Sequence, residues 1–340
     1  AAPALSFSGD PNTGIYNVGA DQLGISTNGT VRVAVDATGR LLTGITTARA
    51  NLFNTTTTAA LQVEGTTVGT SGGLVTLNSA DANSPFIAFA KSRGATVGSN
   101  TVIQNNDGLG HISFQGSDGT EFVEGASIRA FVDGTPGAND LPTRLVFATT
   151  ADAGSTPTTR ATIDSSGRLL VGATTARANF FNSTFTAKEI IEGTGASGAD
   201  RGAIAVVNNS SGDDAPLLIL AKSRGTTIGS NTLCANNEYV GHIAFQANDG
   251  SEFVELANII AMVDGTPGAN DMPGRLVFST TADGASSPTE RIRIISSGAF
   301  KATTDATYYN ATGTEHEFRN STNAAGIFQS STNASFTQVG

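Results

Sequence analysis

Paired glutamates are the residues in this chain whose types and spacing come nearest to a catalytic pattern. Glu121 and Glu124 stand three positions apart, and Glu252 and Glu255 repeat them further along the chain. Two carboxyl groups that flank a glycosidic bond can hydrolyse it. Residues three apart on a regular strand point to opposite faces, however, so they cannot flank one bond unless a bulge intervenes. We therefore expect carboxylates that are solvated or pair subunits, and no enzymatic activity.

Two histidines occupy equivalent positions, His111 and His242, each directly after a glycine. If three copies of the chain met on an axis, their imidazoles could hold a metal ion or an anion. No second histidine or cysteine lies at ligand spacing, which favours a structural hydrogen bond instead. We expect no cofactor and no bound metal, and we expect the single cysteine, Cys234, to fill a small space in the core.

A glycine motif follows an apolar run, where EGTGASG at 192–198 matches the GxGxxG pattern of phosphate-binding loops. Such a loop needs the N-terminus of a helix directly after it. The next residues, ADRGAIAVV, predict a strand, so we interpret the motif as a flexible turn.

The loop VDGTPGAND occurs at 132–140 and, unchanged, at 263–271. Its oxygen-bearing side chains could bind calcium or a sugar. Alternatively, Pro136 and Gly137 set a rigid turn that packs on the next part of the chain. The candidate ligand residues are Asp133, Asn139 and Asp140 in the first loop and Asp264, Asn270 and Asp271 in the second.

These candidates recur because a long stretch of the chain is duplicated. The segment Pro85–Gly167, the first repeat, returns at 216–298 as the second repeat, with a constant shift of 131 residues. Roughly three residues in five are identical, and the unit is too long for one turn of a solenoid. It indicates a whole small domain in tandem.

Composition narrows the fold and the partners. Charged residues make up 14% of the 340-residue chain, there are 40 glycines and no tryptophan, and the formal charge is −10. Small and β-favouring residues joined by turn residues predict an all-β protein. The acidic balance argues against nucleic acid or an anionic membrane as a partner, and no apolar run is long enough for membrane insertion.

Turn signals divide the chain into four segments. Residues 1–44 predict a β meander, 45–172 and 173–303 predict two β modules, and 304–340 predict the start of a diverged third module. Three hairpins with loops that end in Gly39, Gly167 and Gly298 join these segments. Half a module would leave apolar residues without partner strands, and the chain begins without Met. We therefore expect a longer natural polypeptide that continues past Gly340.

Period-two alternation gives the predicted strands two faces. We expect Phe114, Phe122 and Phe147, which recur in the second repeat, to form the core of each module. The opposite face of the long strand is more apolar in the second repeat, where Leu256, Ile260 and Met262 replace Gly125, Arg129 and Phe131. The simplest interpretation is a subunit contact on that face, although deeper burial within one subunit would give the same pattern.

The opening segment SFSGDPNTGIYNVGADQLGISTNG and the stretch from HISFQGSDGTEFVEG through VDGTPGAND to SSGRLLVG resemble tail fibres of tailed bacteriophages, notably those that infect marine cyanobacteria. With the second repeat, the resemblance covers nearly the whole chain. It carries no catalytic motif. Such fibres are typically homotrimers of intertwined β modules, and many end in a self-cleaving chaperone domain, which is not seen in this stretch of sequence.

The resemblance implies an elongated homotrimeric fibre of tandem antiparallel β modules, sandwich-like or prism-like, joined by β-hairpins. It also implies an extracellular location in the virion tail. The expected partners are further copies of the chain, other virion tail proteins, and a host surface glycan or outer-membrane receptor. The function would be that of a structural tail-fibre segment involved in host attachment. A glycan-degrading tailspike and a cellular β-repeat adhesin are the alternatives.

Overall fold

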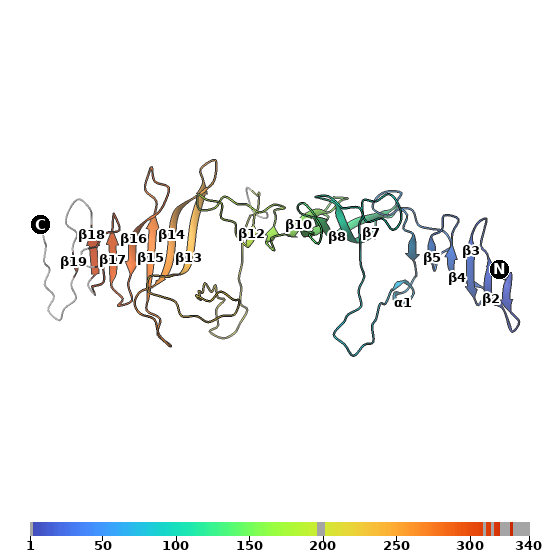
Figure 1. Ribbon diagram of the computed structural model, residues 1–340, viewed down its shortest axis with the longest axis horizontal. Coiled ribbons are helices and arrows are strands. Elements are labelled where there is room, and N and C mark those ends of the chain that lie inside the picture. The colour runs from blue at the N-terminus through green and yellow to red at the C-terminus, as the bar shows by residue number, and fades with distance from the viewer. Residues whose placement is uncertain (1–2, 196–200, 309–310, 314–315, 320–326, 329–340) are drawn as a thin grey trace. The chain divides into compact units, whose positions relative to one another are not determined.

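The computed structural model describes residues 3–195, 201–308, 311–313, 316–319 and 327–328. Within these residues the strands form two six-stranded sheets and one seven-stranded sheet, and the protein is all-β, as the composition predicts (Figure 1). The four-residue helix α1 (Val68–Ser71) lies outside the sheets. The chain forms two compact units. One contains residues 1–175 and 188–202, and the other contains residues 176–187 and 203–340.

The strands follow one another in each sheet in sequence order. The first sheet contains β1 (Leu5–Phe7), β2 (Asp10–Asn17), β3 (Leu23–Thr27), β4 (Thr30–Val35), β5 (Leu41–Thr43) and β6 (Leu61–Val63). The second contains β7 (Gly108–Ser117), β8 (Phe122–Val132), β9 (Thr143–Thr149), β10 (Thr158–Ile163), β11 (Leu169–Val171) and β12 (Glu189–Ile191). The third contains β13 (Tyr239–Asn248), β14 (Phe253–Val263), β15 (Gly274–Thr280), β16 (Thr289–Ile294), β17 (Phe300–Thr303), β18 (His316–Arg319) and β19 (Ile327–Phe328).

Each sheet is an antiparallel meander that contains one parallel strand pair. The pairs β5 with β6, β11 with β12, and β17 with β18 are parallel, whereas the other neighbours are antiparallel. A parallel pair needs a crossover connection, and here the residues after the joining hairpin supply it. The same hairpin and the same crossover therefore end the antiparallel meander three times.

The joining hairpins have a shared side-chain clamp in two of the three cases. Asp164 accepts hydrogen bonds from the backbone N–H groups of Ser166 and Arg168 and from Nε of Arg168 at 2.6 Å. Asp36 makes the same set of bonds in the first hairpin. Gly167 closes its turn at φ +69°, a conformation that costs other L-residues energy.

Strand register assigns the side chains of the second sheet to two faces, because directly paired residues share a face. One face, the open face, carries apolar side chains from β7, β9, β10 and β11 that remain 36–54% exposed in the single chain. They are Ile112, Phe114, Leu145, Phe147, Ile163, Leu169 and Val171. The prediction that Phe114 and Phe147 form a core within one chain is therefore wrong.

Each of the other two sheets has an equivalent open face of its own. In the first sheet its exposed apolar residues are Ile15, Leu23, Ile25, Val35, Leu41, Leu61 and Val63. In the third they are Ile243, Phe245, Leu276, Ile294 and Phe318. A regular stripe of this kind differs from the scattered apolar residues that any protein surface shows.

The opposite face of the second sheet, the covered face, holds the small core. Val146, Thr162, Leu170 and Ile190 pair across neighbouring strands and are at most 7% exposed. A β-bulge at Gly125 shifts the register of β8, so Phe122 lies on this face with Gln115 and not with Phe114. The expected grouping of Phe122 with Phe114 is wrong for that reason.

The connector before β6 covers part of this face. The N–H of Asn54 donates to the carbonyl of Phe122, and the N–H of Phe122 donates to the carbonyl of Asn51. Phe53 takes a left-handed φ of +59° and places its ring 5.4 Å from that of His111. The connector therefore docks on the start of β8.

The more apolar face of the long strand in the second repeat is partly covered by its own chain. Ile260 is 7% exposed and Asn258 is buried, whereas Leu256 remains 48% exposed. Burial within one subunit therefore accounts for Ile260, and the subunit contact expected on this face stays a prediction.

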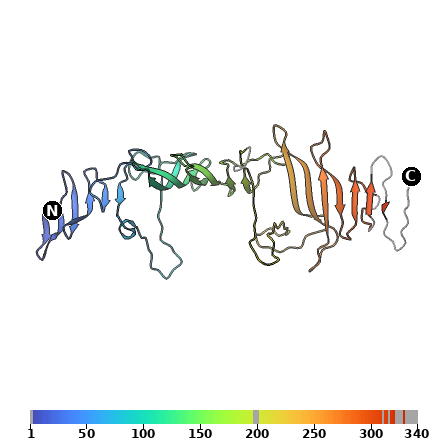
Figure 2. The same ribbon diagram turned by 180° about the vertical axis from the view of Figure 1, so that it is seen from behind.

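Two long segments leave the sheets without forming strands of their own, and Figures 1 and 2 show both as excursions from their sheets. The first arm spans residues 72–90 and the second arm spans 203–221, and neither contains a strand. Large apolar side chains along the arms are 46–87% exposed, among them Leu74, Phe86 and Ile87, then Ile204, Leu217 and Leu218. Sequence analysis did not predict these unpaired segments.

Each arm ends against a glycine of an edge strand. A Cβ added at Gly110 of β7 would lie 2.8 Å from Cβ of Phe89, and one at Gly241 of β13 would lie 3.0 Å from Cβ of Leu220. The close approach explains why a glycine precedes His111 and His242. Among the described residues, no helix has both the length and the apolar character that crossing a bilayer demands.

Candidate functional site

The covered face of the second sheet carries a cluster of three ionisable side chains. Nε2 of His111 lies 2.5 Å from Oε1 of Glu124, and Nη2 of Arg129 lies 2.5 Å from Oε2 of the same carboxylate. Glu124 is 6% exposed. Neighbouring strands supply the three groups, with His111 on β7 and both of the others on β8.

The bulge at Gly125 is what brings Glu124 into the cluster. It places Glu124 opposite Gln115, whereas Ala126 pairs with Phe114 on the open face. The strand pattern allowed Glu121 and Glu124 to act together only if a bulge intervened. Glu121 lies before β8, in the turn where its carbonyl accepts from the N–H of Asp118. Glu124 is instead bonded to His111 and Arg129.

The charge state of Glu124 determines which side chain donates the hydrogen bond between His111 and Glu124. Burial raises the pKa of its carboxyl. Hydrogen bonds from Ser113 and His111 and the charge of Arg129 lower that pKa by more in total, so the net shift is downward. The group is thus an acceptor, and Nε2–H of His111 donates to it. Nε of Arg129 lies 3.2 Å from that same nitrogen and makes no bond to it in this tautomer.

The second repeat keeps the histidine and the carboxylate but loses the arginine. Nε2 of His242 lies 2.7 Å from Oε1 of Glu255, and Ile260 stands where the first repeat has Arg129. The ring of Phe181 lies 5.7 Å from that of His242 and repeats the role of Phe53. Both histidines therefore make structural hydrogen bonds. Among the described residues, no group of three or more His, Cys, Asp or Glu side chains could hold a metal ion.

Asp133, the first of the predicted loop residues, ties two turns together. Its Oδ2 accepts from the N–H of Ser165 at 3.0 Å, and its Oδ1 accepts from Nη1 of Arg144 at 3.0 Å. Burial raises the pKa of Asp133, but the bonds from Ser165 and Arg144 lower it more. Asp264 makes equivalent bonds to Ser296 and Arg275.

Asn139 and Asp140 lie in another hollow than Asp133 does. They line a hollow of about 540 Å³ between the loop after β8 and residues 91–103, together with Lys91 and Pro136. Gly137 and Asp140 exchange backbone hydrogen bonds, and Asn139 takes a left-handed φ of +56°. In the second repeat, Gly268 and Asp271 exchange the same bonds, and Asn270 has φ +55°. The first loop therefore divides its three predicted ligand residues between two hollows.

The described part of the glycine motif, residues 192–195, contains no helix. Gly193 and Gly195 follow β12 in irregular chain, and Gly198 lies outside the described residues. The predicted third module lies partly outside them as well, because residues 309–310, 314–315, 320–326 and 329–340 are not described.

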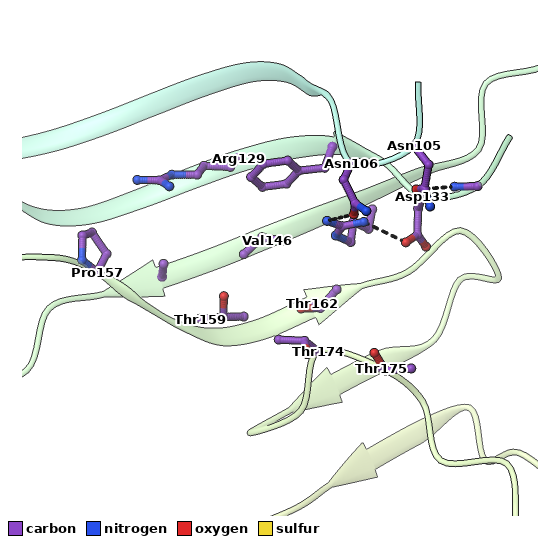
Figure 3. A pocket seen from close by; sticks show the side chains of 14 residues that line it. Asn105, Asn106, Arg129, Asp133, Val146, Pro157, Thr159, Thr162, Thr174 and Thr175 are labelled. Carbon is purple, nitrogen blue, oxygen red and sulfur yellow. Dashed lines mark hydrogen bonds and ion pairs between the residues drawn. The ribbon is translucent and has the colours of Figure 1, made fainter. Parts of the chain in front are cut away.

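A hollow of about 520 Å³ lies beside the histidine cluster, on the covered face (Figure 3). Figure 3 shows Arg129 on β8, Val146 on β9, and Thr159 and Thr162 on β10 arranged across neighbouring strands. The remaining lining comes from Asn105, Asn106, Phe131, Asp133, Gly134, Arg144, Ala148, Pro157, Thr174 and Thr175. Of these residues only Asp133 was predicted as a ligand. The others were not predicted, because they are strand and turn residues of no catalytic or ligand-binding pattern.

No protein-family model and no curated protein matches the chain. Solved structures do. The carboxy-terminal domain of the L-shaped tail fibre of bacteriophage T5 is 14% identical with a TM-score of 0.56, and the match covers 78% of this chain and 100% of that one. The same domain with its intramolecular chaperone is 15% identical with a TM-score of 0.57, and that match covers 79% and 69%. The chain shares the fold of these tail-fibre domains.

Proposed function

We propose that the chain is a structural segment of a phage tail fibre, that it assembles as a homotrimer, and that it takes part in attachment to the host cell surface. The similarity to the T5 tail-fibre domain supports the tail-fibre part of this proposal. The observation that carries it is the open face, because each of the three described sheets has its own row of exposed apolar side chains on one face.

The open face needs a partner because large apolar areas are rarely left in water. A second copy of the same chain offers the same stripe, so copies that run side by side can bury one stripe against another. Three copies around an axis enclose all of their open faces and leave the covered faces outside. The arms strengthen this argument, since their apolar side chains and backbone polar groups also lack cover within one chain.

An enzymatic role finds no support in the described site. A glycosidase needs two carboxyl groups that flank the scissile bond, whereas Glu124 and Glu255 are each held by a histidine. The geometry therefore favours a structural and binding protein over a glycan-degrading tailspike.

The assembly can be tested by multi-angle light scattering of the purified full chain. One copy has a mass of 34.4 kDa, so a trimer would have three times that mass. We expect the double variant Phe114→Glu, Phe147→Glu to lose the assembly, because it places charges on the open face. Thr156→Glu, in the exposed loop after β9, should leave the mass unchanged. A stable monomer from the unmodified chain would refute the proposed homotrimer.

The location can be tested on virus particles from cells that carry the gene. Antibody fragments against the chain should label the tail and reduce adsorption of the particles to host cells. Particles that carry no label, or whose adsorption is unchanged when the label is bound, would contradict the tail location and the attachment role respectively.

A further inference from the structure

The hollow between Arg129 and Thr175 has the volume of a small-molecule site. Its volume of about 520 Å³ lies within the range of roughly 300–1,000 Å³ that ligand pockets occupy. Strands β8, β9 and β10 form its floor, and residues 174–175 after β11 close one side (Figure 3). The site therefore rests on the rigid sheet and belongs to one chain.

The charges that line the hollow cancel one another. Arg129 is paired with Glu124, and Arg144 is paired with Asp133. Each guanidinium already has a carboxylate partner, so an anionic ligand would have to compete with a partner held in place by the fold. This balance favours an uncharged ligand.

Neutral hydrogen-bonding groups remain available around the rim. Oδ1 of Asn105 accepts a hydrogen bond from the N–H of Gly134, and Oδ1 of Asn106 accepts one from Nη2 of Arg144. Their NH₂ groups and the hydroxyls of Thr159, Thr174 and Thr175 have no protein partner within the described residues. The rim thus offers both donors and acceptors in a small space.

The floor is apolar except for one buried hydroxyl. Val146 and Ala148 are at most 7% exposed, and the ring of Phe131 lies under the guanidinium of Arg144, with 5.0 Å from Cζ to the ring centroid. Thr162 is 1% exposed, and its Oγ1 has no partner in the described chain. Buried hydroxyls normally have a partner, so this one marks a place where bonding is incomplete.

We propose that this hollow binds a neutral saccharide unit. Sugar hydroxyls donate and accept at once, which matches the rim, and the C–H groups of a sugar ring match the apolar floor. The inference deepens the proposed attachment function and rests on it. In an assembly that buries the open faces, the covered face and its hollow point outward, where a surface glycan can reach them.

The second repeat provides an internal comparison, because the same place is filled. At the positions of Thr159 and Thr162 it has Glu290 and Arg293, which form a salt bridge at 2.5 Å. Tyr308 donates to Glu290, and the guanidinium of Arg293 lies 4.7 Å from the centroid of its ring. A hollow of about 450 Å³ remains near His242 and Glu255, but it lacks the asparagine and threonine rim. We expect one saccharide site per chain.

The test is saturation-transfer NMR and calorimetry on the intact assembled chain. The probes are glucose, galactose and N-acetylglucosamine, with glucuronic and galacturonic acid as charged counterparts. We expect at least one neutral sugar to bind with a Kd in the millimolar range or below, and the acids to bind at least 10-fold more weakly. Failure of all three neutral sugars to bind, or tighter binding of an acid, would overturn the proposal.

Matched variants locate the site. Thr159→Val removes one hydroxyl but keeps the branched shape, and Asn106→Gly removes the amide while allowing the left-handed φ of +68°. Each should weaken binding at least 10-fold. Asn237→Gly makes the same change in the second repeat, also at φ +68°, and should leave binding unchanged. Equal loss in both repeats, or no loss in either, would refute this location.

The saccharide test and the attachment test fail separately. Sugar binding is measured on purified chain, whereas adsorption is measured on particles with a bound antibody fragment. Absent sugar binding with adsorption still blocked by antibody would refute only the saccharide site. Sugar binding with unchanged adsorption would refute only the role in attachment.

Discussion

Nζ of Lys301 lies 3.8 Å from Oε2 of Glu317, and both side chains are almost completely buried, at 0% and 4% exposure. The two residues pair directly between the parallel strands β17 and β18. At the preceding joint the same place holds Leu170 and Ile190, which pair between β11 and β12. A buried ion pair therefore replaces an apolar pair at the same position of the fold.

We expect Lys301→Leu alone to destabilise the third sheet by about 3–5 kcal/mol, because it leaves a buried carboxylate without this cation. The double variant Lys301→Leu, Glu317→Ile copies the preceding joint and should recover the loss or exceed the original stability. Urea unfolding of the three proteins measures the difference. A double variant as unstable as the single one would contradict the expectation.

Acid should destabilise the protein through its clamping aspartates. The folded-state pKa values of Asp133, Asp164 and Asp264 lie below the ordinary value of 3.8, because backbone and arginine N–H groups outweigh the effect of burial. A lowered folded pKa adds stability that is present above pH ~4 and is lost as pH falls through the folded value. The melting temperature should be nearly constant from pH 8 to 5 and should fall below pH 4.

The double variant Asp133→Asn, Asp164→Asn tests this origin of the acid sensitivity. It should melt at a lower temperature than the parent at pH 7 and show a shallower fall below pH 4, since two of the titrating groups are absent. The parent and the variant should approach each other near pH 2. Parallel curves over the whole range would show that other groups control the acid response.

Gly167→Ala should cost about 1 kcal/mol, because the turn requires φ +69°. The position is open, with nothing within 4 Å of an added Cβ, so strain in the backbone is the only expected effect. Gly116→Ala, in β7, also meets nothing within 4 Å and has no positive φ, and it should cost little. Thermal melting of the two variants compares them directly, and equal losses would rule out backbone strain as the cause.

The arms should be covered in the assembled protein. Chymotrypsin cleaves after large apolar residues such as Leu74 and Phe86, which are 87% and 81% exposed in one chain. We expect slow cleavage in the assembly and fast cleavage in the Phe114→Glu, Phe147→Glu variant. Rapid cutting of the first arm while light scattering still gives the assembled mass would show that the arms stay free.

The sequence was sufficient to predict the all-β class and the duplication, because both follow from composition and from a constant shift between the copies. It could not predict which face of the strands is covered. Alternation separates Phe114 from Arg129, but both faces carry apolar groups, and the choice depends on where the connectors dock. The bulge at Gly125 leaves little trace in the pattern, although it moves Phe122 and Glu124 to the covered face.

The candidate site was harder to predict for a similar reason. Arg129, Thr159 and Thr162 are ordinary strand residues, and only their places on three neighbouring strands bring them to one hollow. The repeated loop residues attracted attention because they are identical in both copies. Asp133 is held by turn bonds that both copies make, whereas Arg129, Thr159 and Thr162 of the hollow are replaced in the second repeat.

The recurring hairpin and parallel pair also bear on how such a chain can change its length. Unequal recombination between equivalent codons of the two repeats would remove or add one unit of 131 residues. The new junction would still join a hairpin to the same crossover, and every strand would keep its register and its open face. The number of repeats could then change by whole units during evolution. Single substitutions within one copy would alter the surface chemistry of that copy and leave the other unchanged.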